Sequence, residues 1–271
     1  MKRILLLTSI LFVSLMGGAC APSLELEETP FALEMNLETE PADQTEMLVD
    51  PKTDEKSGII MPHHELAGEI IELAWERALK AEPDLIVLIG PDHPGRAAYP
   101  LIWTEGTERQ ADLIVSELAG DWIQSGLGGM AIAADHSIET PLMFLPEEAR
   151  EIPVLAMTVP RGMDDEILDR ILAAIQSLQG NCLLVGSVDF SHNLVSEEAE
   201  GKDEASWTWI QNRELESIKY AGNEYFDSPE TLLILLGCLE GEADRILRSD
   251  SSDFGWSVSL LGTSYQVIQF N

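Results

Sequence analysis

The chain has 271 residues, of which 45% are hydrophobic, enough to form one sizeable core with a small appendage. Its 48 acidic residues outnumber 16 basic ones and give a formal net charge of −32, which argues against nucleic acid as a partner because the phosphates would be repelled. Three cysteines are too few to build a disulfide scaffold.

The first 20 residues have the pattern of an export signal. Lys2 and Arg3 form a basic start, and residues 4–16 form an apolar run that is short for a membrane span. The next segment, Gly17-Gly-Ala-Cys20, resembles the end of a bacterial lipoprotein signal, although that pattern prefers leucine where Gly17 stands. We therefore expect an exported lipoprotein, anchored to the membrane on the extracytoplasmic side through a lipidated Cys20. Ordinary secretion and an uncleaved anchor are the alternatives.

Residues 21–57 are acidic and follow neither a helical nor a strand period. Glutamates and aspartates recur throughout this segment, interrupted by Pro22, Pro30, Pro41 and Pro51. Like charges and prolines both oppose compact burial. We expect a disordered tether that holds the following domain away from the membrane.

The remaining residues, 58–271, are expected to form a single folded domain in which strands and helices alternate. Apolar runs predict strands at 58–62, 84–90, 99–103, 152–159 and the first half of 181–192, and the tail at 255–270 predicts a closing strand or hairpin. Helical spacing predicts helices at 66–80, 109–118, 139–150, 163–178, 203–221 and 229–248, the last interrupted near 237–241, and glycines at 126, 128 and 129 mark a loop. This alternation predicts an α/β fold with three layers, in which helices cover both faces of a mostly parallel central sheet.

All five histidines lie in turns or loops that follow apolar segments. They are His63, His64, His93, His136 and His192. Polar residues just past the carboxyl ends of buried strands are where open α/β sheets place their sites. We therefore expect these histidines to converge on one site. The sequence has no glycine-rich phosphate loop and no Gly-x-Ser-x-Gly elbow, so nucleotide binding and serine hydrolysis have no support.

Two of the histidines suit a metal site. His63 and His93 follow the first two strands, which are joined by one helix, so both imidazoles should lie at one edge of the sheet. Cys238 is a candidate thiolate for the third ligand, although it would also fit a buried position in a helix. Glu240 or Glu139 would instead complete a set of two histidines and one carboxylate, the arrangement of non-haem iron oxygenases.

Three further residues are candidates for catalysis. Asp189 and His192 lie three positions apart and suit acid–base chemistry, because the carboxylate can orient the imidazole. His136, in the segment Asp135-His-Ser-Ile-Glu139, either faces the site or only caps local structure. His64 is expected in a supporting or exposed position.

Several of these segments together resemble the MEMO family, whose prokaryotic members are called AmmeMemoRadiSam system protein B. The matching segments, in chain order, are Ile59-Ile-Met-Pro-His63, Leu88-Ile-Gly-Pro-Asp-His93, Asp135-His-Ser-Ile-Glu139, Ile152-Pro-Val154 and Ser187-Val-Asp-Phe-Ser-His192. The combination of Asp-His-Ser-Ile-Glu with Asp-Phe-Ser-His is specific, whereas each motif alone is not. The resemblance runs over most of the chain from Gly58 onward.

The resemblance implies a fold related to the LigB-type class III extradiol dioxygenases and a site that binds an iron or copper ion. It implies two histidine ligands and one cysteine ligand with acid–base residues around them, here matching His63, His93 and Cys238 with Asp189, His192 and His136. A functional link to radical-SAM and AMMECR1-like proteins is also implied. The chain departs from the family where Pro-His-His-Glu-Leu replaces Pro-His-Ala-Gly-Tyr, and where Leu239 and Glu240 follow the cysteine in place of glycine.

We therefore expect a membrane-tethered metal-binding protein with iron- or copper-dependent redox or dioxygenase-type chemistry on a small molecule. The alternatives are a metal- or ligand-binding module without turnover, and a degenerate scaffold that no longer holds a metal. A disulfide between Cys182 and Cys238, which an oxidising compartment would allow, would remove the thiolate ligand.

Overall fold

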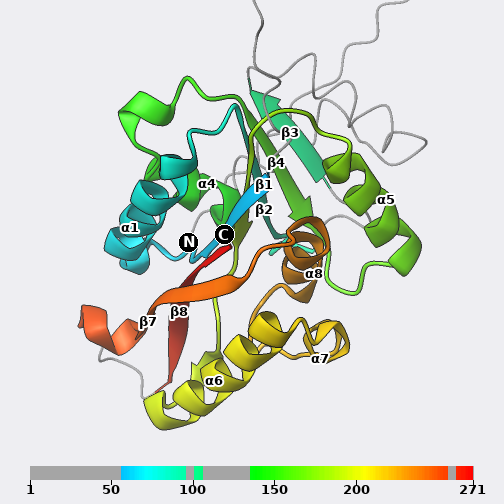
Figure 1. Cartoon of the computed structure of the whole chain (residues 1–271). Helices are drawn as coiled ribbons and strands as arrows, with labels where there is room; N and C mark the ends of the chain where they lie inside the picture. Colours follow the sequence, from blue (N-terminus) through cyan, green and yellow to red (C-terminus); the bar gives the residue numbers. More distant parts are fainter. Residues whose placement is uncertain (1–55, 96–100, 106–134, 256–260, 271) are drawn as a thin grey trace, which may run out of the picture. The chain divides into compact units, whose positions relative to one another are not determined.

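The structure is a computed structural model that describes residues 56–95, 101–105, 135–255 and 261–270 (Figure 1). The expected signal peptide and nearly all of the expected tether lie outside these residues, as do the helix predicted at 109–118 and the glycine loop at 126–129. Among the described helices, none has the length and apolar character needed to cross a membrane.

Strands and helices alternate along most of the described chain. The strands are β1 (Lys56–Met61), β2 (Leu85–Pro91), β3 (Leu101–Glu105), β4 (Val154–Val159), β5 (Cys182–Ser187), β6 (His192–Leu194), β7 (Ala243–Asp250) and β8 (Gly262–Phe270). The helices are α1 (Gly68–Ala78), α4 (His136–Met143), α5 (Asp165–Gln176), α6 (Ser196–Asn212), α7 (Leu215–Lys219) and α8 (Pro229–Cys238).

The strands form one mixed sheet in the order β3-β4-β2-β5-β1-β8-β6, with β7 also paired to β8. The four central strands, β4, β2, β5 and β1, run parallel. β3 pairs antiparallel with β4 at one side, and β8 pairs antiparallel with β1, β6 and β7 at the other. The predicted α/β architecture is confirmed, and its parallel part is limited to the centre of the sheet.

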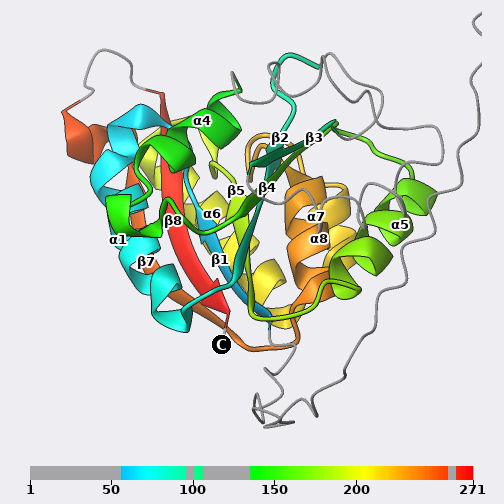
Figure 2. The same cartoon turned by 90° about the horizontal axis from the view of Figure 1, so that it is seen from above.

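Helices cover both faces of this sheet because its central strands are apolar on both sides. In β2, Leu85, Val87 and Ile89 belong to a core shared with α5, α6, α7 and α8. The alternate residues, Ile86 and Leu88, belong to a second core shared with α1 and α4. Figures 1 and 2 show α1 and α4 on one side of the sheet and α5 and α8 on the other, which gives the predicted three layers.

Helix α8 packs directly on β5 and has one end near the carboxyl edge of the sheet. Ser228 caps its first turn by accepting a hydrogen bond from the backbone N–H of Thr231, and Pro229 occupies the start of the helix. A Cβ atom added at Gly186 of β5 would lie 2.7 Å from a terminal methyl group of Leu235, so any larger residue here would require that side chain to move.

Three predicted helices differ from the observed elements. The helix predicted at 139–150 is α4, which ends at Met143, followed by a separate 3-10 helix at Glu147–Ala149. The helix predicted at 203–221 is two helices, α6 and α7, because Arg213 has a φ of 55° in the left-handed region and ends α6. The prediction of helix at 243–248 is wrong, because this segment forms β7. β7 pairs with β8 from Ala243 opposite Phe270 to Asp250 opposite Ser264, so the hydrogen bonds of a neighbouring strand override the local helical preference.

Candidate metal centre

The carboxyl ends of three neighbouring parallel strands place polar side chains at one edge of the sheet. β1, β5 and β2 lie next to one another, so these ends meet. His63, His93 and Asp189 each lie two residues beyond the end of one of these strands. The structure brings His63 and His93 together as expected, with their ring centroids 4.9 Å apart.

Helix α4 brings His136 to the same edge. Its cap, Asp135, accepts a hydrogen bond from the backbone N–H of Ser137 at 3.0 Å, and the hydroxyl of Ser137 donates to the carbonyl of Pro91 at 2.9 Å. This close contact requires Gly90, because a Cβ atom there would lie 2.7 Å from the Cβ of Ser137. The first turn of α4, which begins at His136, is therefore held against the end of β2.

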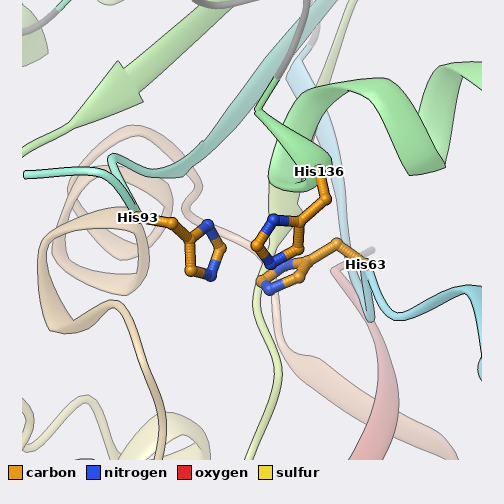
Figure 3. A group of neighbouring side chains, drawn as sticks. All are labelled: His63, His93 and His136. Atoms are coloured by element: carbon orange, nitrogen blue, oxygen red, sulfur yellow. The ribbon is translucent and has the colours of Figure 1, made fainter. Parts of the chain in front are cut away.

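The imidazoles of His63, His93 and His136 form one group (Figure 3). One ligand nitrogen from each ring lies within 4.8 Å of the other two. The ring of His136 stacks on that of His93 with centroids 3.8 Å apart, and it lies 5.2 Å from that of His63. The side chain of His63 is 1% exposed, that of His93 29% and that of His136 55%, so the group opens to solvent on the side of His136.

Hydrogen bonds fix which nitrogen of His63 and of His93 faces the group. The hydroxyl of Ser187 donates its proton to the carbonyl of Ser137 at 2.5 Å, so it accepts a hydrogen bond from Nδ1 of His63 at 3.1 Å. Nδ1 of His93 donates in the same way to Oδ1 of Asp135 at 2.9 Å. When these two rings are neutral, each therefore presents the lone pair of Nε2, as metal-binding histidines do when an outer partner holds their other nitrogen.

A carboxylate that the sequence reasoning missed, Asp227, lies against the same nitrogens. Oδ2 of Asp227 is 3.0 Å from Nε2 of His63 and 3.8 Å from Nε2 of His93. The backbone N–H of Asp227 donates to the carbonyl of Asp189 at 3.1 Å, which joins the start of α8 to the loop after β5. The only sequence signal at this position is an acidic residue just before the helix start at Ser228, which is typical of many helices.

The carboxylates make this edge of the sheet favourable for positive charge. Burial disfavours the charged form of His63, but Asp189 and Asp227 outweigh this effect and raise the pKa of His63. Asp189 also accepts the backbone N–H of His63 at 3.0 Å. Burial acts against the charged form of Asp227 as well, yet the imidazoles of His63 and His93 hold the pKa of Asp227 well below its usual range.

In the pair of His93 and Asp135, as in that of His63 and Asp227, attraction between opposite charges outweighs the cost of burial. His136 differs. Burial opposes the charge on His93, but the hydrogen bond to Asp135 and the nearby carboxylate of Asp227 prevail and raise the pKa of His93 to about 9. Burial also opposes the charge on Asp135, and the contact with His93 lowers the pKa of Asp135 to about 2. The pKa of His136 is lowered by burial and by the charges of His93 and His63.

The structure does not form the predicted pair of Asp189 and His192. Asp189 is directed at His63, and among the described residues no ion pair joins Asp189 to the ring of His192. The backbone N–H of His192 donates to the carbonyl of Asn223 at 3.1 Å. Nδ1 of His192 is buried without a hydrogen-bond partner among the described residues, and His192 is among the groups that lower the pKa of Asp227.

The structure places Cys238 away from the histidines, contrary to the prediction of a thiolate ligand. Cys238 is the last of the 10 residues of α8, so about 15 Å of helix separates it from the end that adjoins Asp227. Burial raises the pKa of the Cys238 thiol to about 12, opposed by the charge of Lys56 at the start of β1. No disulfide joins Cys182 to Cys238, so the alternative pairing does not form.

The other candidate residues also lie outside the histidine group. Glu139 is exposed on α4, and Glu240 is exposed just beyond Cys238. His64 has the expected supporting position, because its Nδ1 accepts the backbone N–H of Leu66 at 3.3 Å and so caps the short turn before α1.

Comparison with known proteins identifies relatives of this chain. The chain is 28% identical over 161 residues to a MEMO1 family protein of Methanopyrus kandleri, covering 54% of this chain and 56% of that protein. It is 26% identical over 196 residues to a MEMO1 family protein of Aeropyrum pernix, covering 64% of this chain and 67% of that protein. The chain thus spans little more than half the length of the Methanopyrus relative.

A solved structure supports the fold, and a family model identifies the family. The crystal structure of an uncharacterized protein from Escherichia coli K12 superposes with a TM-score of 0.52 at 11% identity, covering 80% of this chain and 100% of that one. The model of the Memo-like protein family matches residues 27–221, a range that begins within the expected tether and excludes both Asp227 and Cys238. Because this match covers more than half of the chain, the chain belongs to the Memo-like protein family.

Proposed function

We propose that this chain is a metal-binding member of the Memo-like family, and that His63, His93 and His136 hold one first-row transition-metal ion. The observation that carries the proposal is the convergence of one ligand nitrogen from each imidazole within 4.8 Å of the other two. Neutral imidazole is the commonest protein ligand for such ions.

The surroundings of the histidines support the same proposal. Ser187 and Asp135 hold the outer nitrogens of His63 and His93, which orients both rings toward one point. The buried carboxylates of Asp189 and Asp227 lie close to Nε2 of His63, and their negative charge offsets the cost of burying a cation there.

We further propose redox or dioxygenase-type chemistry on a small molecule. A bound iron or copper ion would supply the redox activity, as the family resemblance implies. A small molecule would approach past His136, whose side chain is 55% exposed. His192 has an unpartnered Nδ1 among the described residues and lies near Asp227, so it is suited to accept or hold a proton. Asp189 is then a positioning residue for His63.

Metal analysis of the tag-free, full-length protein tests the metal site. Wild type is expected to carry stoichiometric iron or copper, and His63→Ala and His93→Ala are expected to lose it. His136→Ala should weaken binding less, because its ring is the most exposed of the three. His64→Ala is the matched control, because its ring caps a turn. Equal, substoichiometric metal in all of these proteins would show that the proposal is wrong.

Oxygen consumption distinguishes an enzyme from a binding module. The metal-loaded protein is expected to consume oxygen with a catechol-like substrate, and His192→Ala is expected to reduce the rate while leaving the metal content unchanged. If wild type holds its metal but consumes no oxygen over a panel of such substrates, the chain is a metal or ligand carrier.

We also propose that the protein is tethered to a membrane through a lipidated Cys20. The basic start, the short apolar run and the small residues before Cys20 support this proposal. Labelled palmitate should be incorporated into wild type but not into Cys20→Ser. Wild-type protein without label would contradict the lipoprotein assignment.

A further inference from the structure

We infer that Asp227 is a direct ligand of the same metal ion, so that the centre consists of three imidazoles and one carboxylate with no thiolate. This inference rests on the proposed metal site of His63, His93 and His136 and goes beyond it. It replaces the cysteine ligand that the family resemblance implies with an oxygen ligand specific to the arrangement of this chain.

The separations of Asp227 from two of the three imidazoles fit one shared ion. Oδ2 of Asp227 lies 3.0 Å from Nε2 of His63 and 3.8 Å from Nε2 of His93. Two donors bound to one ion at about 2.1 Å lie about 3.0 Å apart at a right angle and about 3.4 Å apart at the tetrahedral angle. The first separation falls in this range, and a small rotation of the side chains brings the second into it.

With both rings in the neutral form that binds metals, the chemistry of the three atoms favours a cation between them. In the metal-free protein, a proton on Nε2 of His63 fits the 3.0 Å contact with Asp227, and a metal ion would take its place. Nδ1 of each ring is held as a hydrogen-bond donor. In the neutral rings, Nε2 of His63 and of His93 can therefore only accept a hydrogen bond, and the same is true of Oδ2 of Asp227. Acceptors that point at one another repel unless a positive charge lies between them. A metal ion at this point bonds to all three at once.

Beyond its contacts with His63 and His93, the carboxylate of Asp227 has few partners among the described residues. Both oxygens are buried, and neither accepts a well-aligned hydrogen bond from any residue that the structure describes. A buried carboxylate without such bonds is costly, and in native proteins it calls for a specific explanation. Coordination of a metal ion provides one.

The backbone around Asp227 is held so that the carboxylate keeps its direction. The N–H of Asp227 donates to the carbonyl of Asp189, and Nη1 of Arg161 donates to the carbonyl of Asp227 at 3.3 Å. Nη2 of Arg161 donates to the carbonyl of Ala221 at 2.7 Å, and the next residue, Ser228, caps α8. A carboxylate fixed in this way is prepared for coordination before the ion arrives.

The donor set determines which ions the centre prefers. Imidazole suits iron, zinc, copper and nickel, and a carboxylate oxygen favours divalent ions, whereas a thiolate would favour Cu(I). Three imidazoles and Asp227 therefore select a divalent ion such as Fe(II), Co(II) or Zn(II). Cu(I), which prefers soft sulfur ligands, is expected to bind weakly.

Co(II) is the probe for this inference, because its visible spectrum reports coordination directly. Titration of the metal-free, full-length wild type should give d–d bands without a thiolate-to-metal charge-transfer band. Asp227→Cys should gain such a band, since it appears only when sulfur is bound to the ion. Asp227→Asn should bind Co(II) at least about 100-fold more weakly than wild type does. Removal of an outer hydrogen-bond partner of a ligand costs about 10–100-fold in metal affinity, so the loss of a direct ligand should reach or exceed the upper end of that range. Asp189→Asn, which alters an outer partner, should lose less.

The outcomes of the titration distinguish a failure of the proposed metal site from a failure of the inference that Asp227 is a ligand. If wild type binds no Co(II), the proposed metal site fails. If wild type binds Co(II) but Asp227→Cys gains no charge-transfer band and Asp227→Asn binds as tightly as wild type, only the inference about Asp227 fails. A charge-transfer band in wild type would place a native cysteine on the metal and would also overturn it. Should Asp227→Cys not fold, as judged by circular dichroism, the affinity of Asp227→Asn decides.

Discussion

Asp135 holds His93 at two points: its Oδ2 accepts the backbone N–H of His93 at 3.1 Å, and its Oδ1 lies 2.9 Å from Nδ1 of the ring. The same carboxylate caps α4 by accepting the N–H of Ser137. One side chain therefore links the loop after β2 to the helix that begins with His136, and the relative position of two candidate ligands depends on it.

Replacement of Asp135 by asparagine should weaken metal binding. The amide keeps the shape of the carboxylate but removes the charge that orients Nδ1 of His93, so the metal affinity is expected to fall about 10–100-fold. Competition with a chromogenic chelator measures this loss. Glu139→Gln, an exposed change on the same helix, should bind as wild type does. An unchanged affinity in Asp135→Asn would mean that the ring of His93 needs no outer partner.

The stability of the metal-free protein should depend on pH through the pair of His93 and Asp135. The pKa of His93 is raised from 6.5 to about 9, so its contribution is complete below pH 6.5 and is lost as the pH rises to 9. The pKa of Asp135 is lowered from 3.8 to about 2, so its contribution is complete above pH 3.8 and is lost as the pH falls to 2.

Urea unfolding in the presence of a chelator tests this window. The free energy of unfolding of wild type should decrease between pH 6.5 and 9, and His93→Gln should reduce that decrease. Equal slopes in the two proteins over this range would contradict the assignment of the raised pKa to His93.

Metal affinity should change with pH in the opposite direction. His93 is protonated at pH 7 in the metal-free protein, because its pKa is about 9, and only the neutral ring binds a metal. The apparent affinity for Co(II) should therefore rise from pH 6.5 to 9, and binding should release protons. Calorimetry at pH 7 in buffers of different ionisation enthalpy counts these protons, and a count of zero would be contrary to this expectation.

Cys238 should be inert in the folded protein and dispensable for metal binding. Burial raises the pKa of its thiol to about 12, so the reactive thiolate is scarce at neutral pH. Alkylation followed by mass spectrometry should modify Cys238 only after unfolding. Cys238→Ala should cost about 1 kcal/mol of stability, as a typical single substitution does, and leave the Co(II) affinity unchanged. A loss of affinity would favour a thiolate ligand.

Gly90→Ala should disturb both stability and the metal centre. The added Cβ would lie 2.7 Å from the Cβ and Oγ of Ser137, so α4 must shift away from β2, at a cost of about 1–3 kcal/mol. Because α4 begins with His136, metal affinity should fall as well. Gly201→Ala is the control: its added Cβ would meet no atom within 4 Å, and the change should stabilise the exposed part of α6 by about 0.5–1 kcal/mol.

Much of the α/β architecture could be predicted because its signals are local. The central strands are continuous apolar runs, as expected for strands buried on both faces, and each helix on the sheet has its own apolar spacing. The proximity of His63 and His93 followed from the same information. Parallel strands joined by one helix end at the same edge of a sheet, so residues two positions beyond those ends lie together.

The wrong predictions for residues 243–248 and for the pair of Asp189 and His192 have a common cause. Both features depend on contacts between segments that are distant in sequence. Residues 243–250 form a strand since β8 offers hydrogen bonds to β7, and no local pattern reveals this partner. Asp189 pairs with His63 although His192 is nearer in the chain, because the register of β1 with β5 sets their two loops side by side.

The position of Asp227 against the predicted ligand Cys238 illustrates the difference most clearly. Asp227 and Cys238 lie at opposite ends of α8 and its cap, Ser228. From the sequence, the metal affinity of a thiolate favoured the cysteine as a ligand. The direction of α8 on the sheet decides otherwise. Asp227, just before the helix, contacts His63, and Cys238 lies about 15 Å away at the other end of the helix. The sequence by itself determined most of the strands, the helices on both faces of the sheet and the proximity of His63 and His93. Only tertiary packing, which sets the direction of α8, determined that Asp227 rather than Cys238 reaches them.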